Sequence, residues 1–146
     1  MGHKTKNGIN SYFVDSSMMN SEQVAAVNYR YPVIGMAVAW AVNDFIFSEK
    51  GYYVRWEDDG QEIIEAVAQR IGFDDVKVVR AILIAYIANG FFDLDLFYRY
   101  GILSSKEHQV LFRKTATKVH RKIKSIKPQY DLTGRFGDGP KRLTPT

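Results

Sequence analysis

The chain has 146 residues, of which 46% are hydrophobic and 25% charged, a composition that suits one compact domain with a sizeable core. The absence of cysteine excludes disulfides, thiolate metal sites and cysteine nucleophiles. The net charge of +4 combines −4 over residues 1–112 with +8 over residues 113–146. This asymmetry predicts an acidic partner for the basic part: nucleic acid, a membrane surface or the protein's own body.

The first predicted elements are a short extended segment and a helix. Residues 9–14 contain three successive apolar residues and are predicted to be extended. Asn20 and Gln23 have the spacing of a capping box, which predicts a helix over residues 21–30. The polar N-terminus lacks the apolar stretch of a secretory signal, so we expect a cytoplasmic protein.

An apolar helix is predicted over residues 32–48, with Pro32 in its first turn. The helix is apolar nearly all round, which is typical of a central, buried helix. Trp40 is therefore expected in the core, where its truncation to alanine would cost about 3–5 kcal/mol. The segment is shorter than the roughly 20 residues of a membrane span, so no membrane contact is expected. Residues 52–56 are predicted to form a short strand.

Two helices joined by a short turn are predicted next. Helical spacing of apolar residues covers residues 61–71, and Gly72 is a natural stop. The following helix begins at Asp74 or Asp75 and ends at about residue 88. Two helices joined by about three residues that include a glycine are typical of a helix-turn-helix.

An alternating apolar pattern follows over residues 92–100. It predicts a half-buried strand, or a hairpin that turns near residues 93–95. A hairpin directly after a helix-turn-helix is a wing. We therefore predict a mainly helical protein with a small β-hairpin, of winged-helix type, with a long C-terminal helix.

The last helix is predicted to begin at a capping box of Ser104 and Glu107 and to extend to about residue 124 or 126. The residues beyond it are mostly Gly, Pro, Thr, Lys and Arg, which is typical of an irregular segment. Residues 1–126 are thus expected to form a single winged-helix-like domain, and residues 127–146 a basic flexible tail.

Several short motifs along the chain are shared with a known domain family. They are Tyr12-Phe13-Val14-Asp15, Gly35 and Trp40 in the apolar helix, Gly51-Tyr52-Tyr53, Ala88-Asn89-Gly90-Phe91-Phe92 and Gly101-Ile102-Leu103-Ser104-Ser105. Over residues 11–122 the chain resembles an uncharacterised N-terminal domain of bacterial and phage proteins, often found upstream of DnaD-like replication segments. The resemblance implies a winged-helix fold and a link to replication initiation or a mobile element. It implies no known activity.

Patterns for catalysis and metal binding are weak. The sequence holds no nucleophile elbow, phosphate-binding loop or His-Glu-x-x-His motif. His108 and His120 lie about 120° apart around the predicted last helix, so solvated or partner-facing histidines are expected rather than a metal site. Asp93 and Asp95 could hold a cation, but solvent-facing wing charges are the favoured interpretation. No catalytic, cofactor or metal site is predicted.

Aromatic residues form a cluster that allows two interpretations. Its members are Tyr52, Tyr53, Trp56, Phe91, Phe92, Phe97, Tyr98 and Tyr100. Aromatic side chains on a β surface can stack on unpaired bases. They also fill the cores of small domains, and this second interpretation is favoured.

The candidate nucleic-acid contacts lie on the last helix and, secondarily, on the second helix of the helix-turn-helix. They are Arg113, Lys114, Lys118, Arg121, Lys122 and Lys124, with Lys77 and Arg80. The helix that carries the last two has acids at its start and no base-reading residues in its first turn, so it suits DNA reading poorly. The last helix could lie along phosphates. Alternatively, it docks on the body and leaves a solvated basic face.

An apolar stripe with heptad-like spacing runs along the same last helix. Its members are Phe112, Ala116, Val119, Ile123 and Ile126. The stripe predicts docking on the body, or self-association through Phe112, Val119 and Ile123. We therefore expect a non-catalytic nucleic-acid-binding accessory protein. The alternative is a protein-interaction or assembly module without direct nucleic-acid binding.

Overall fold

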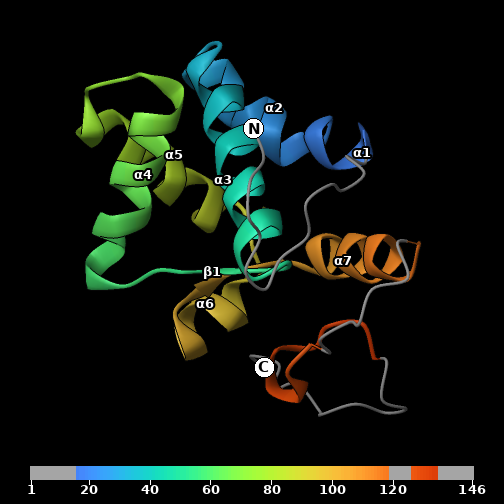
Figure 1. Ribbon diagram of the computed structural model, residues 1–146. Helices are drawn as coiled ribbons and strands as arrows, with labels where there is room; N and C mark the ends of the chain where they lie inside the picture. The colour runs from blue at the N-terminus through green and yellow to red at the C-terminus, as the bar shows by residue number, and fades with distance from the viewer. Residues whose placement is uncertain (1–15, 119–125, 135–146) are drawn as a thin grey trace.

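Helices dominate residues 16–118 and 126–134, the part of the chain that the computed structural model describes (Figure 1). The α-helices are α1 (Ser16–Met19), α2 (Glu22–Arg30), α3 (Ile34–Glu49), α4 (Gln61–Ile71), α5 (Val76–Ala88), α6 (Leu94–Tyr100) and α7 (Lys106–Lys118). Two short 3-10 helices are η1 (Asp58–Gly60) and η2 (Pro128–Tyr130). Strands β1 (Val54–Arg55) and β2 (Ile102–Leu103) form one antiparallel pair, with Val54 opposite Leu103. None of the helices in these ranges is long and apolar enough to cross a membrane.

The α2–α3 corner is built by side-chain caps. Ser21, one residue after the predicted cap, accepts a hydrogen bond from the backbone N–H of Val24 at 3.2 Å and begins α2. At the far end of α2, Asn28 Oδ1 accepts from the backbone N–H groups of Val33 at 2.9 Å and Met36 at 3.2 Å. A Cβ atom on Gly35 would lie 2.9 Å from the Asn28 Cα atom, so only glycine lets α2 and α3 approach this closely.

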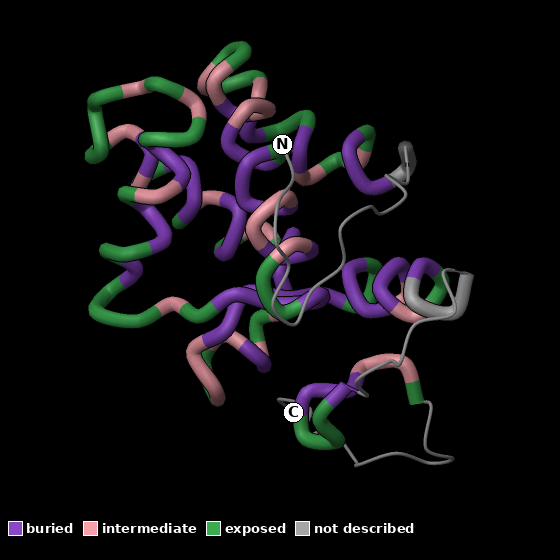
Figure 2. Tube along the Cα trace, viewed as in Figure 1, coloured by how far each residue is buried: buried purple, intermediate pink, exposed green. Residues whose placement is uncertain are grey.

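α3 is the central helix, as predicted, with α2, α4 and α5 packed against it (Figure 2). Val38 and Val42 are fully buried. Trp40, in contrast, is 42% exposed, so its predicted core position is wrong. It lies two residues from each of these valines, which turns it to roughly the opposite side of the helix at about 100° per residue. The predicted cost of 3–5 kcal/mol for its truncation is therefore too large.

The predicted helix-turn-helix pair is present as α4 and α5. Gly72 ends α4 in the left-handed conformation, with φ of 72°. Asp75 then caps α5, because its side chain accepts hydrogen bonds from the backbone N–H groups of Lys77 at 3.2 Å and Val78 at 3.4 Å. The stop at Gly72 was predicted correctly, and Asp75 is one of the two predicted starts of α5, because each end depends on local residues.

The predicted strand or hairpin over residues 92–100 is wrong, since α6 occupies this segment. Asp93 caps α6 by accepting from the backbone N–H of Leu96 at 3.0 Å, and Gly101 ends the helix with φ of 66°. The alternating pattern does not distinguish a strand from a helix here. Leu96 and Tyr100 are four residues apart, and residues at that spacing lie on the same side of a strand and also on the same side of a helix. The β-structure consists instead of β1 and β2, which are distant in sequence.

The last helix begins at Lys106, and Ser105 rather than Ser104 supplies the side-chain cap. Ser105 Oγ accepts from the backbone N–H of His108 at 3.1 Å, whereas Ser104 Oγ donates to the carbonyl oxygen of Tyr52 at 2.5 Å. α7 is described as far as Lys118. The remainder of the predicted long helix, residues 119–125, lies outside the described residues.

The first part of the predicted flexible tail packs against α7. Gln109 Nε2 donates to the carbonyl oxygen of Tyr130 at 2.7 Å, and Gln109 Oε1 accepts from the backbone N–H of Leu132 at 2.7 Å. Tyr130 and Asp131 are each 5% exposed. We call residues 126–134 the docked segment. The rest of the predicted tail, residues 135–146, lies outside the described residues.

Candidate nucleic-acid interface

One side of α7 is buried against the rest of the domain. Leu111 and Phe112 are 5% and 3% exposed. The Phe112 ring lies against Tyr52, with 5.3 Å between ring centroids, and fills the space beside Gly51, where a Cβ atom would come within 2.4 Å of it. The predicted use of Phe112 in self-association is therefore wrong, because its ring is enclosed by its own chain. Val119 and Ile123 lie outside the described residues.

Buried polar groups hold the same side of α7 to α3. His108 is fully buried; its Nε2 donates to Asn43 Oδ1 at 2.7 Å and its Nδ1 accepts from Ser105 Oγ at 2.6 Å. The prediction of a solvated or partner-facing His108 is therefore wrong, and His120 lies outside the described residues. Burial lowers the pKa of His108 to about 3, so the imidazole is neutral at ordinary pH.

Ser105, His108 and Asn43 form a hydrogen-bonded chain that joins α7 to α3. A general base works best when its pKa lies near the operating pH, and burial lowers the pKa of His108 to about 3. Ser105 Oγ is also occupied as the cap of α7. The three side chains thus pin α7 to α3. Among the described residues, no group of three or more His, Asp or Glu side chains could hold a metal ion.

The outer side of α7 carries exposed cations. Lys106 and Lys114 are exposed there, together with the carboxylate of Glu107. Arg113 is instead held within the chain: its guanidinium donates to Asp131 Oδ2 at 3.0 Å and to Thr133 Oγ1 at 3.2 Å. The side chain of Lys118 is not described.

The remaining candidates on the last helix, Arg121, Lys122 and Lys124, lie outside the described residues.

The docked segment connects α7 to α6. Tyr130 contacts Tyr100 of α6 edge to face, with 5.1 Å between ring centroids. Two cations flank this tyrosine pair: the Arg99 guanidinium lies 6.0 Å from the Tyr100 ring, and Lys127 Nζ lies 5.6 Å from the Tyr130 ring. We use the name α6–α7 surface for the exposed cations of these three elements: Arg99 of α6, Lys114 of α7 and Lys127 of the docked segment. Sequence reasoning missed Arg99 and Lys127, since only the docked segment brings them together.

The secondary candidates on α5 do not extend this surface. Figure 1 shows α4 and α5 on the left of the molecule and α7 on the right. Lys77 is exposed, whereas the Arg80 guanidinium donates to Asp59 Oδ2 at 2.6 Å and to the Asp59 carbonyl oxygen at 2.8 Å. The outer face of α5 otherwise consists of the exposed apolar residues Ala81, Ile84 and Ala88.

The aromatic cluster is mostly core, as favoured. Its buried members, Tyr52, Tyr53, Phe91 and Phe92, are at most 7% exposed. Burial raises the pKa of Tyr52 to about 12, so its hydroxyl stays protonated, and its oxygen accepts from the backbone N–H of Lys127 at 3.1 Å. Tyr98 is the exception, because 78% of it is exposed.

The two candidate carboxylates of the predicted wing have local roles. Asp93 is the cap of α6. Asp95 pairs with Arg99 at 3.5 Å one helical turn later. Their predicted position on one face of a strand is wrong, because α6 is a helix.

A sequence model of the Lin1244/Lin1753-like N-terminal domain matches residues 12–107. The chain belongs to this family. In this Lin1244/Lin1753-like domain the match covers the described elements from α1 to β2 and ends in the first turn of α7. Most of α7 and the docked segment thus lie beyond the matched range. No curated protein and no solved structure has a significant match to the chain.

Proposed function

We propose that this protein is a non-catalytic accessory protein that binds nucleic acid through the α6–α7 surface and the basic residues that follow α7. The core of α3, α4, α5 and the β1–β2 pair supports a winged-helix-type scaffold, in which α6 stands where a wing hairpin would. The resemblance to domains upstream of DnaD-like segments favours a cytoplasmic role in replication initiation or in a mobile element.

The observation that carries the proposal is the way α7 is docked. The apolar side of α7 and His108 are buried against the body, and Lys106 and Lys114 are exposed on its outer side. The docked segment adds Lys127 and meets Arg99 of α6 through the Tyr130–Tyr100 contact. In the sequence, residues 113–146 carry a net charge of +8, whereas residues 1–112 carry −4. Such a surface binds phosphates by releasing condensed counterions.

Affinity for duplex DNA should therefore depend steeply on salt. If about five cations touch phosphates, the logarithm of the affinity should fall against the logarithm of salt concentration with a slope near −4 to −5. Replacing Lys114 and Lys118 with glutamine should flatten that slope by about 2, and adding Arg121→Gln and Lys122→Gln should flatten it by about 2 more. Fluorescence anisotropy with a labelled duplex at several salt concentrations measures the slope.

The matched control is the double variant Arg30→Gln with Lys77→Gln, which removes the same charge from exposed residues at the end of α2 and on α5. Its slope should stay close to that of the unmodified protein. Equal flattening by both double variants would show that charge alone, rather than the α6–α7 surface, determines binding. An absence of binding at low salt would overturn the proposal.

The apolar outer face of α5 favours a second candidate, self-association through this helix. Ile84 is 40% exposed between the exposed Ala81 and Ala88, and small residues allow a second helix to approach closely. Under this proposal Ile84→Asp should convert a dimer into a folded monomer, because a carboxylate cannot be buried unpaired between two helices. Sedimentation velocity of both proteins tests it, with Val76→Asp as an equally exposed control. A monomeric unmodified chain at high concentration would rule this candidate out.

A further inference from the structure

We infer that the side chains that hold the docked segment form a recognition site for an extended peptide, and that the docked segment of a second copy binds there by exchange. This docking site consists of Tyr52, Tyr53, Tyr100, Gln109 and Arg113. The inference concerns assembly, so it goes beyond the proposed function and does not depend on it.

The backbone of the docked segment is bound by side chains of the docking site. Gln109 is fully buried; its amide donates to the carbonyl oxygen of Tyr130 at 2.7 Å and accepts from the backbone N–H of Leu132 at 2.7 Å. The Tyr52 hydroxyl accepts from the backbone N–H of Lys127 at 3.1 Å. One amide thus pairs with the C=O and N–H groups of residues two apart, as a neighbouring strand does when it binds an extended peptide.

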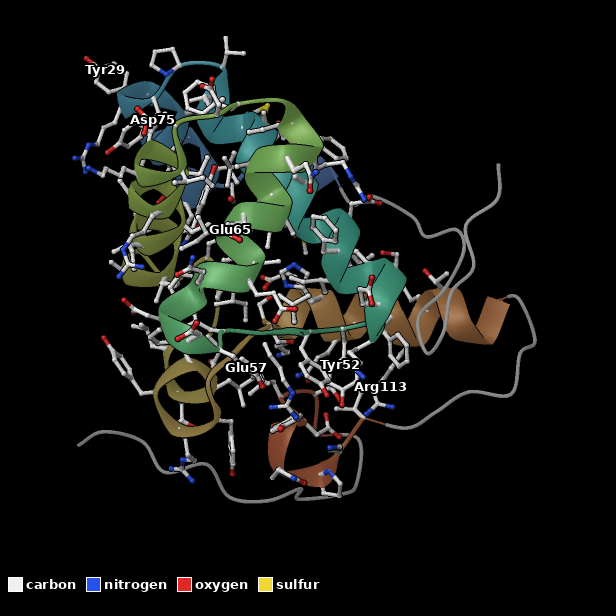
Figure 3. The ribbon with its side chains drawn as sticks, turned by 60° about the vertical axis from the view of Figure 1, so that its left-hand side comes forward. Tyr29, Tyr52, Glu57, Glu65, Asp75 and Arg113 are labelled. Carbon is white, nitrogen blue, oxygen red and sulfur yellow. The ribbon has the colours of Figure 1, made fainter. Side chains whose placement is uncertain are left out.

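Two adjacent side chains of the docked segment make the recognition specific. The Tyr130 ring lies edge to face against Tyr53 at 5.4 Å and against Tyr100 at 5.1 Å between ring centroids. The Asp131 side chain is fully buried and accepts from the guanidinium of Arg113 at 3.0 Å (Figure 3). A buried carboxylate without its cation is costly, so the site selects a peptide in which an aromatic residue precedes an acidic one.

A second copy of the chain carries the peptide that fits this site. The docking site belongs to α6, α7 and the residues before β1, so it is complete without the docked segment. The docked segment of a second copy would make the same contacts there as it makes in its own chain, which is the condition for exchange between copies. Residues 119–125 connect α7 to the docked segment, and so short a connection gives an effective concentration of about a millimolar. The unmodified chain should therefore be a monomer at micromolar concentration and form exchanged dimers as its concentration approaches about 1 mM.

Charge reversal at the Arg113–Asp131 pair tests the exchange. In the full chain, Arg113→Asp alone or Asp131→Arg alone places like charges together and should weaken docking within the chain by about 100-fold or more. In an equal mixture, the docked segment of each variant meets a site of opposite charge on the other variant. The mixture should therefore sediment as a dimer at micromolar concentration, and each variant alone as a monomer. The double variant Arg113→Asp with Asp131→Arg should be a monomer, because the reversed pair forms within one chain.

The matched control reverses the Arg80–Asp59 pair, whose charged atoms are 2.6 Å apart. This pair joins α5 to η1, and both of these elements pack against α4 within the body. A mixture of Arg80→Asp and Asp59→Arg should therefore contain only monomers. Dimers in this control mixture would overturn the inference. So would a monomeric mixture of Arg113→Asp and Asp131→Arg chains that circular dichroism shows to be folded.

A second measurement requires only the Asp131→Arg variant. A fluorescent peptide with the sequence of residues 126–134 is titrated against the full-length variant and against the unmodified chain. The variant should bind the peptide at least about 10-fold more tightly, because its own docked segment is repelled by Arg113. The same peptide with Asp131→Arg should lose this advantage. Equal binding of the original peptide by the two chains would overturn the inference.

Discussion

Replacing Phe112 with alanine should lower the free energy of unfolding by about 3–5 kcal/mol. The ring is 3% exposed, and it fills the space beside Gly51 and against Tyr52, so its removal leaves a cavity between α7 and the body. Urea titration followed by circular dichroism measures the loss. The loss should be the same at low and high protein concentration, because the ring packs within its own chain rather than against a second copy.

Trp40→Ala is the control for this prediction, since it also truncates a large aromatic side chain. Trp40 is 42% exposed, so its loss should be clearly smaller, about 1–2 kcal/mol. A loss below about 1 kcal/mol for Phe112→Ala, or an equal loss for the two variants, would contradict the docking of α7 described above.

Acidification should destabilise the protein through His108. Burial lowers its pKa in the folded protein from 6.5 to about 3, so between these values the unfolded chain binds more protons than the folded one. Stability is therefore complete above about pH 6.5 and is lost as the pH falls toward 3, by up to about 1.4 kcal/mol per pH unit. Urea titrations at several pH values from neutral to acidic measure this slope.

The contribution of His108 is isolated by comparison with His108→Gln, whose amide can still donate to Asn43 Oδ1. The carboxylates titrate alike in both proteins, so their effects cancel in the difference between the two stability curves. That difference should shrink as the pH falls through the acidic range. A difference that is independent of pH would show that His108 is not buried as a neutral group.

The helical scaffold was largely predictable because its boundaries depend on local residues. Gly72 and Asp75 define the turn between α4 and α5, and they act through their own backbone conformation and side-chain caps. The buried positions of α3 followed from the apolar composition of residues 33–47. These features need no knowledge of distant parts of the chain.

The wrong predictions concern segments whose local pattern suits two structures, and residues whose burial depends on a partner distant in the sequence. Alternation over residues 92–100 suits a strand, but Asp93 and Gly101 are caps that make a seven-residue helix possible. His108 was predicted to be solvated or partner-facing because its spacing from His120 does not suit a metal site. Only the position of Asn43, far away in the sequence, makes the burial of His108 possible. Trp40 was predicted to be buried because its segment is apolar. In a helix, however, successive residues point in different directions, and Trp40 lies on the side opposite to the buried Val38 and Val42.

The sequence by itself determined the family, the mainly helical class and the concentration of basic charge after residue 112. Only the tertiary structure decided which of those charges face outward. Arg113 is paired with Asp131, and outside this segment Arg80 is paired with Asp59, whereas Lys114 and Lys127 remain exposed. The physical reason is that charge is a property of composition, but its availability to a ligand depends on ion pairs and burial between residues that are distant in sequence.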